Sequence, residues 1–149
     1  MMTPTPRGFT LLIAVILTSV LLAVSLSLVD TSYKQLVLSS TARQSEIAFY
    51  IADTALECAL YHDQQQGAFA YSGAAGTIFC NNQNLPLSTS VSGSIRTTTF
   101  TIPCNGGGTQ GGVTVYKNTT GATQLYATGY SSCSVTDPRR VERGLKVTY

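Results

Sequence analysis

The chain has 149 residues, the size of one ordinary domain, and only 11% of them are charged, about half the usual share. Its formal net charge of +2 creates no basic field, so charge gives no reason to expect nucleic-acid binding, which remains only an alternative. Outside an apolar N-terminal segment, the polarity comes mainly from Ser, Thr, Gly, Asn and Gln, as in secreted surfaces and packed fibres.

The first predicted element is an apolar helix from Phe9 to Val29. It has no charged residue over 21 positions and would be about 31 Å long, enough to cross a bilayer. Because Arg7 precedes it, we expect the N-terminus in the cytoplasm and the remainder outside, anchored in the cytoplasmic membrane. The segment is too long for a cleaved secretory signal, and the small-residue pattern near Ala23 is weak. A permanent single-span anchor and a leader cut in front of the segment both stay open.

The junction before the apolar segment reads Arg7-Gly8-Phe9-Thr10-Leu11-Leu12. This order resembles the leader of type IV pilins and pseudopilins. The resemblance implies that a prepilin peptidase removes residues 1–8 by cutting after Gly8, and that Phe9 becomes an N-methylated N-terminus. It also implies that the pilus assembly machinery joins the subunit to other pilin subunits through the apolar helix, in a cell-surface pilus or pseudopilus that serves functions such as adhesion or secretion.

One position departs from the pattern of that family. Most members carry a glutamate at the fifth mature position, where this chain has Ile13. The carboxylate that would pair with the N-terminal ammonium of a neighbouring subunit is therefore missing. This departure favours a minor or tip-located subunit, as in PilX-type minor pilins.

Residues 30–62 are predicted to continue the helix as an amphipathic segment, because no proline occurs before Pro86. A bend is compatible with the polar cluster at residues 39–41. The stretch from Ala42 to Glu57, in which an aromatic precedes an Ala-acid-x-Ala-Leu run, also resembles the PilX-type N-terminal region. Apolar residues at three- and four-residue steps are predicted to face a sheet, namely Ile47, Ile51, Ala55 and Cys58.

Residues 63–149 are predicted to form a globular head. Residues 63–93, rich in Gln, Gly, Ala, Ser and Asn, are expected to be a surface loop region, and residues 106–112 a glycine-rich loop. About four antiparallel strands are expected, at Ser94–Ile102, Val113–Lys117, Gln124–Tyr130 and Val141–Thr148. The predicted fold class is α+β, with a long N-terminal helix, membrane-spanning and then amphipathic, packed on a C-terminal antiparallel sheet.

The cysteines follow the apolar segment and form no C-x-x-C motif, so disulfides are a better interpretation than a zinc site. Spacing alone cannot separate the possible pairings. A preference for short loops favours Cys58 with Cys80 and Cys104 with Cys133.

Catalytic and cofactor-binding residues are not indicated. His62 is the single histidine and is expected to be a solvated side chain at a helix end. Arg139, Arg140 and Arg143 could contact an acidic partner, DNA or a neighbouring subunit, or could be edge-strand charges. Tyrosines in the sheet region could form an adhesive surface or be ordinary strand residues. We expect a structural subunit that is not an enzyme and has no cofactor or metal; the alternative is an anchored binding module or adhesin that does not polymerise.

Overall fold

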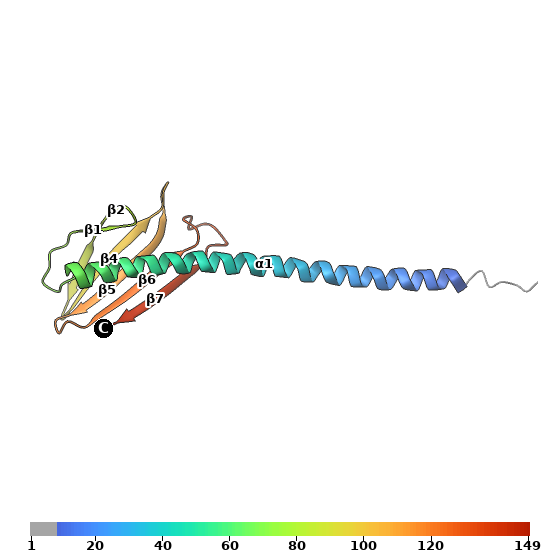
Figure 1. Cartoon of the computed structure of the whole chain (residues 1–149), viewed down its shortest axis with the longest axis horizontal. Helices are drawn as coiled ribbons and strands as arrows, with labels where there is room; N and C mark the ends of the chain where they lie inside the picture. The colour runs from blue at the N-terminus through green and yellow to red at the C-terminus, as the bar shows by residue number, and fades with distance from the viewer. Residues whose placement is uncertain (1–8) are drawn as a thin grey trace, which may run out of the picture. The chain divides into compact units, whose positions relative to one another are not determined.

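The computed structural model describes residues 9–149, which form one long helix, a two-stranded hairpin and a five-stranded antiparallel sheet (Figure 1). The predicted α+β class is confirmed, whereas the predicted leader, residues 1–8 with Gly8, lies outside the described residues. The elements are α1 (Phe9–Gln66), β1 (Thr77–Cys80), β2 (Gln83–Pro86), β3 (Ser88–Ser92), β4 (Ile95–Pro103), β5 (Thr109–Asn118), β6 (Thr123–Tyr130) and β7 (Glu142–Thr148).

The chain divides into two compact units between Ser40 and Thr41. In the first unit the described residues all belong to α1. The second unit contains the remainder of α1 and every strand of the described chain. The polar cluster at residues 39–41, where a bend was compatible with the sequence, is helical throughout.

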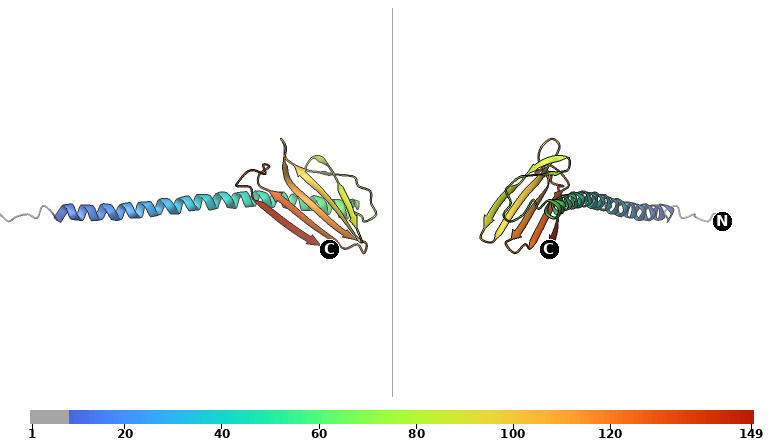
Figure 2. Two further views of the ribbon diagram at one scale, coloured as in Figure 1. Left: turned by 180° about the vertical axis from the view of Figure 1, so that it is seen from behind. Right: turned by 60° about the vertical axis from the view of Figure 1, so that its left-hand side comes forward.

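The five strands of the sheet follow one another in chain order, from β3 to β7, and each pairs antiparallel with the next. Figure 2 shows them side by side, with β7 in red at one edge. Strands β4 to β7 occur where the sequence predicted strands, because alternating Thr, Val, Ile and Tyr side chains suit a half-buried pleated surface.

Residues 63–93 are not the loop region that the sequence predicted, since they contain β1, β2 and β3. These strands are only four or five residues long, and β2 and β3 carry few apolar side chains, which explains why their pattern gave no clear signal. Asn81 and Asn82 both have positive φ angles (50° and 59°), as a two-residue β-hairpin turn requires. The predicted glycine-rich loop is also shorter than expected, because β5 begins at Thr109.

The helix packs on the sheet through alanines rather than through the predicted stripe. Ala48, Ala52, Ala55 and Ala59 are fully buried, whereas Ile47 is 38% exposed and only Ala55 of the predicted stripe lies in the buried core. The physical reason lies in the sheet, where Gly129 faces the helix backbone at Ala48 and Ala52, and Gly111, its partner on the neighbouring strand, faces the side chain of Ile51. We call this pair the glycine notch. Only small helix side chains fit where the two backbones approach so closely.

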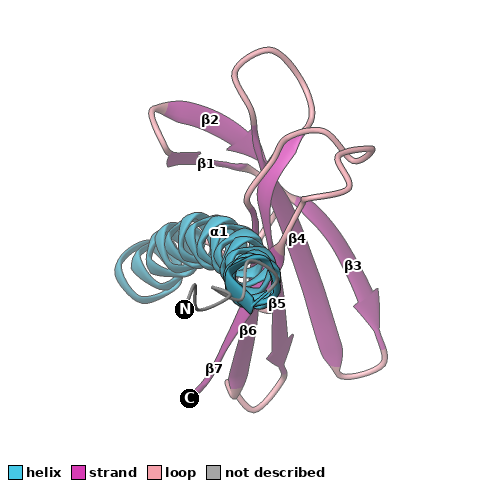
Figure 3. Cartoon of the chain, turned by 90° about the vertical axis from the view of Figure 1, so that its right-hand side faces the viewer, coloured by secondary structure: helices cyan, strands magenta, loops and turns pink. Residues whose placement is uncertain are grey.

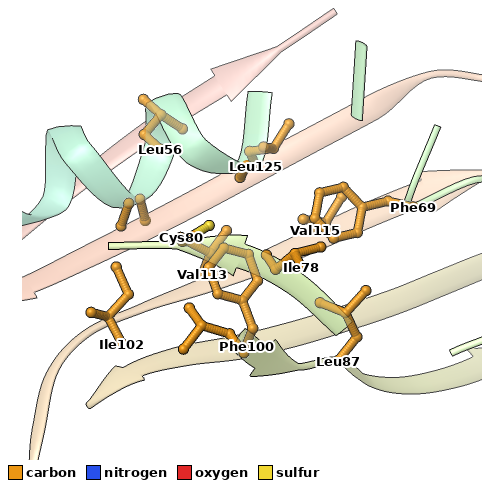
Figure 4. Close-up of a cluster of buried hydrophobic side chains, with 14 residues drawn as sticks. Leu56, Phe69, Ile78, Cys80, Leu87, Phe100, Ile102, Val113, Val115 and Leu125 are labelled. Carbon is orange, nitrogen blue, oxygen red and sulfur yellow. The ribbon is translucent and has the colours of Figure 1, made fainter. Parts of the chain in front are cut away.

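The core lies between α1, the β1–β2 hairpin and one face of the sheet (Figure 4). The rings of Phe69 and Phe100 stack with their centroids 6.2 Å apart, and Ile78 and Leu85 bring the hairpin into the same cluster. The hairpin therefore closes a side of the core that the helix does not cover.

A buried arginine fixes the segment that follows the helix. Arg96 on β4 is only 4% exposed, and its guanidinium donates hydrogen bonds to the carbonyl oxygens of Ala70, Tyr71 and Gly73. Its charge is therefore met by backbone dipoles, and the loop between α1 and β1 is tied to the sheet.

The two faces of the five-stranded sheet differ in chemistry. Figure 3 shows the hairpin and the end of α1 on one face. The alternate residues, which point to the other face, are mainly Thr, Ser and Tyr, and most of them are exposed or half-buried. No helix or strand of the described chain covers this second face, which we call the outward face.

Candidate functional site

The most exposed apolar surface of the described chain is the first half of α1. Between Phe9 and Val29, 14 large apolar side chains are at least 40% exposed, and they occur on every side of the helix. A helix that is apolar all round is typical of a membrane span or of a buried core helix. By length and composition α1 can cross a membrane, and the most apolar part of the helix has no buried residue.

Three hydroxyl groups in this segment are satisfied within the helix. Thr18 donates to the carbonyl oxygen of Ala14 at 3.0 Å, Ser19 to that of Ile16 at 2.8 Å, and Ser25 to that of Leu21 at 2.8 Å. Such internal bonds remove the need for water, so these polar residues do not prevent the segment from entering lipid.

Two disulfides connect elements of the second unit. Cys58 on α1 is bonded to Cys80 at the end of β1, and Cys104, after β4, is bonded to Cys133, in the loop before β7. The Cα atoms are 6.1 and 6.2 Å apart, within the ordinary range for disulfides. This is the pairing that short loops favoured. A helix that can span a membrane, together with two disulfides, indicates that residues 41–149 lie outside the cytoplasm.

Removing either disulfide is expected to destabilise the second unit. The double change Cys58→Ala and Cys80→Ala opens a loop with a sequence separation of 22 residues, and the pair Cys104→Ala and Cys133→Ala opens one of 29. Loop-closure entropy then predicts a loss of about 3 kcal/mol in the free energy of unfolding for each pair. Denaturant unfolding of the full chain in detergent measures both losses. An unchanged midpoint would contradict the prediction.

His62 is buried, so the prediction of a solvated side chain was wrong. It is 4% exposed, and its Nε2 lies 3.1 Å from the carbonyl oxygen of Phe79. Because a carbonyl oxygen only accepts hydrogen bonds, Nε2 carries a proton and donates it. The ligand atoms of Cys58, His62 and Cys80 lie within 4.8 Å of one another, but the two sulfurs form a disulfide and offer no thiolate to a metal.

A buried ionic cluster connects the end of α1 to the sheet. Lys117 Nζ donates to Asp63 Oδ1 at 2.6 Å, and the Tyr149 hydroxyl donates to Asp63 Oδ2 at 2.6 Å. The side chains of Asp63 and Lys117 are only 2% and 18% exposed. Both carboxylate oxygens are thus bonded. Tyr149 is 45% exposed as a whole, but the partial burial of its hydroxyl, followed by the hydrogen bond to Asp63 and the charge of Asp63, raises its pKa well above the ordinary value.

The raised pKa makes stability depend on alkaline pH. The Tyr149 contribution should be complete below about pH 10, where the tyrosine of the unfolded chain also keeps its proton. At higher pH the unfolded chain loses that proton while the folded chain retains it, so stability should fall. We expect a smaller fall between about pH 9 and pH 11 in Tyr149→Phe. Denaturant midpoints across that range test this, and equal slopes for the two proteins would contradict it.

The three arginines predicted to contact a partner have different surroundings. The Arg140 guanidinium lies 3.8 Å from the centroid of the Tyr130 ring, and Arg143 Nε donates to Ser45 Oγ on α1 at 2.7 Å. Arg139 is exposed in the turn that precedes β7. Two of the three side chains thus contact their own chain, and a role for them in partner binding stays a prediction.

A shallow pocket of about 420 Å³ lies at one end of the outward face. Its signal in the sequence is only a general one, the abundance of tyrosine in the predicted strands. Its lining comes from β4, β5, β6 and the turn between the last two, and consists of Ile95, Tyr116, Asn118, Ala122, Gln124 and Tyr126.

No protein-family model, curated protein or solved structure matches the chain. The function must therefore be argued from the residues themselves.

Proposed function

We propose that this chain is a structural subunit of a filament of the type IV pilus or pseudopilus class, and most simply a minor one. The single observation that carries the proposal is the exposed apolar half of α1, with 14 large side chains open on all sides between Phe9 and Val29. Such a surface needs either lipid or other apolar helices around it.

Leaving this helix surface in water would cost more free energy than folding of the chain supplies. If only about 1,000 Å² of this apolar surface stayed in water, the cost would be about 25 kcal/mol. That exceeds the total stability of an ordinary domain, about 5–15 kcal/mol. The segment is therefore dissolved in a membrane before assembly and buried against like helices afterwards, in an open-ended array of subunits.

The leader pattern supports assembly over simple anchoring. A cut after Gly8 would leave Phe9, the first described residue of α1, as the N-terminus of an uninterrupted helix. Ile13 replaces the usual glutamate, so the subunit cannot supply the carboxylate that pairs successive subunits, which favours a sparse or tip position. In this proposal the head displays binding surfaces and catalyses no reaction.

The N-terminus of the mature protein tests the proposal directly. We expect mass spectrometry to find a methylated Phe9 in cells that contain a prepilin peptidase, and an uncut chain in cells that lack it. An intact Met1 in both strains would support the alternative, an anchored module that does not polymerise. Cleavage near Ala23 would mean a freely secreted head and would overturn both.

A charge placed in the apolar segment should prevent assembly. An aspartate near the centre of a membrane helix costs about 2.5–3.5 kcal/mol, and Leu21, which is 65% exposed, lies near the centre of the segment. We expect Leu21→Asp to lower the amount of subunit in sheared filaments about tenfold or more. Val135→Asp, at a loop position that is 76% exposed, is the matched control and should assemble normally. Equal assembly of the two variants would contradict the proposal.

A further inference from the structure

The pocket on the outward face contains an aromatic pair that is held in place by the sheet. The rings of Tyr116 on β5 and Tyr126 on β6 meet edge to face, with their centroids 5.9 Å apart and their planes at 87°. Each residue is 38% exposed although the adjacent positions on its strand face the core or are half-buried. The strands therefore present two rings to solvent at a fixed angle, without using them in the core.

Two amide side chains lie at the edge of these rings. Gln124 is directly opposite Tyr116 in the pairing of β5 with β6, and its side chain is exposed. Asn118 Oδ1 accepts hydrogen bonds from the backbone nitrogens of Thr120 and Ala122, at 3.0 and 2.9 Å. These bonds fix the amide of Asn118 by its oxygen and leave its NH₂ group able to donate to a ligand.

A positive charge lies over one of the two rings. Lys146 on β7 does not line the pocket itself but lies beside it, since it is paired with Tyr126 and its Nζ lies 4.9 Å from the centroid of that ring. The ion pairs among residues 9–149 are Asp30 with Lys34 and Asp63 with Lys117, so Lys146 has no carboxylate partner there. Glu142 points to the same face, but it is four residues along an extended strand, about 13 Å away.

We propose that this pocket binds a saccharide that carries a carboxylate. Flat aromatic faces accept the apolar side of a sugar ring, the amides of Asn118 and Gln124 bond its hydroxyls, and Lys146 meets its charge. A volume of about 420 Å³ lies within the range of small-ligand sites, which combine apolar walls with a few fixed polar groups. A nucleic-acid strand would need several cations along its backbone, whereas Lys146 is the cation placed against these two rings. Arg140 lies over Tyr130, which is four residues farther along β6, about 13 Å away.

The inference goes beyond the proposed filament role and does not rest on it, because binding is measured on the isolated protein. The probe is a linear tetramer of galacturonic acid, titrated calorimetrically into the full chain in detergent micelles, with an uncharged tetramer of glucose as the comparison. We expect saturable binding of the acidic tetramer, at least about fivefold tighter than any binding of the neutral one, as an ion contact of about 1 kcal/mol gives.

Three variants give the test its specificity. Lys146→Gln should weaken binding of the acidic tetramer about fivefold, and Tyr126→Ala should weaken it about tenfold or more. Arg139→Gln removes one positive charge from an exposed turn outside the pocket and should change affinity less than about twofold. Unfolding midpoints are recorded for each variant, and because Lys146 is exposed its substitution should leave the fold intact.

Several results would overturn the proposal. These are no saturable binding, equal binding of the two tetramers, or an equal loss in Lys146→Gln and Arg139→Gln, which would indicate a general effect of net charge. Each of these outcomes leaves the filament proposal untouched, since the N-terminus and the assembly of the subunit are measured separately.

Discussion

Gly129→Ala is expected to destabilise the second unit by about 3 kcal/mol or more, although the substitution adds only one methyl group. A Cβ at Gly129 would overlap the carbonyl oxygen of Ala48 and lie 2.5 Å from the amide nitrogen of Ala52. Both are backbone atoms of α1, so no side chain can rotate away to make room. The helix would have to lift from the sheet, and the buried alanines would lose their contacts.

A matched glycine on the same sheet shows whether packing causes the loss. Gly144 on β7 has its nearest atom 3.7 Å from a built Cβ, which is ordinary van der Waals contact. Neither Gly129 nor Gly144 has a positive φ, so backbone strain does not separate them. We expect Gly144→Ala to change the free energy of unfolding by less than about 1 kcal/mol. Denaturant unfolding compares the two, and similar values would contradict the close approach of helix and sheet at the glycine notch.

Breaking the buried ion pair should also be strongly destabilising. Asp63→Asn leaves the ammonium of Lys117 without a charged partner, although its side chain is only 18% exposed. We expect a loss of about 3 kcal/mol in the free energy of unfolding, at the low end for a buried pair because Lys117 keeps some contact with water.

A variant with both charges replaced distinguishes the interaction between Asp63 and Lys117 from the contribution of their surroundings. Replacing both partners with apolar residues of similar size, in Asp63→Leu with Lys117→Met, removes the unpaired charge and should recover much of the loss. A double-mutant cycle from unfolding midpoints measures the coupling. Strictly additive losses would show that the two side chains do not stabilise one another in the folded chain.

Local patterns in the sequence were sufficient for much of this fold. The uncharged run from Phe9 to Val29, the alternation in the last four strands and the even number of cysteines each reflect a short-range rule of length, period or composition. These rules hold whatever the remainder of the chain does, so the helix, the four strands and the α+β class could be predicted.

The same rules were insufficient where the packing or stability of one element depends on another element. Ile47 and Ile51 looked like the packing stripe because they are the larger apolar residues, yet Gly129 brings the alanine face of α1 against the sheet, and Ile51 is only half-buried beside Gly111. The regular spacing of Ala48, Ala52, Ala55 and Ala59 was a usable signal for a close helix contact. The short strands β1 to β3 gave little signal, because their stability comes from pairing and from the hairpin's contribution to the core.

By itself, the sequence determined that the chain has an apolar helix able to enter a membrane, a strand-rich second half and cysteines suited to disulfides. Only the tertiary structure decided which face of α1 is buried, that Asp63 meets Lys117 and Tyr149, and that Tyr116, Tyr126 and Lys146 share one surface. The physical reason is sequence separation. Asp63 and Tyr149 are 86 positions apart, and their contact depends on strand register and on the packing of α1. Neither of these can be read from the periodicity of a short stretch of sequence.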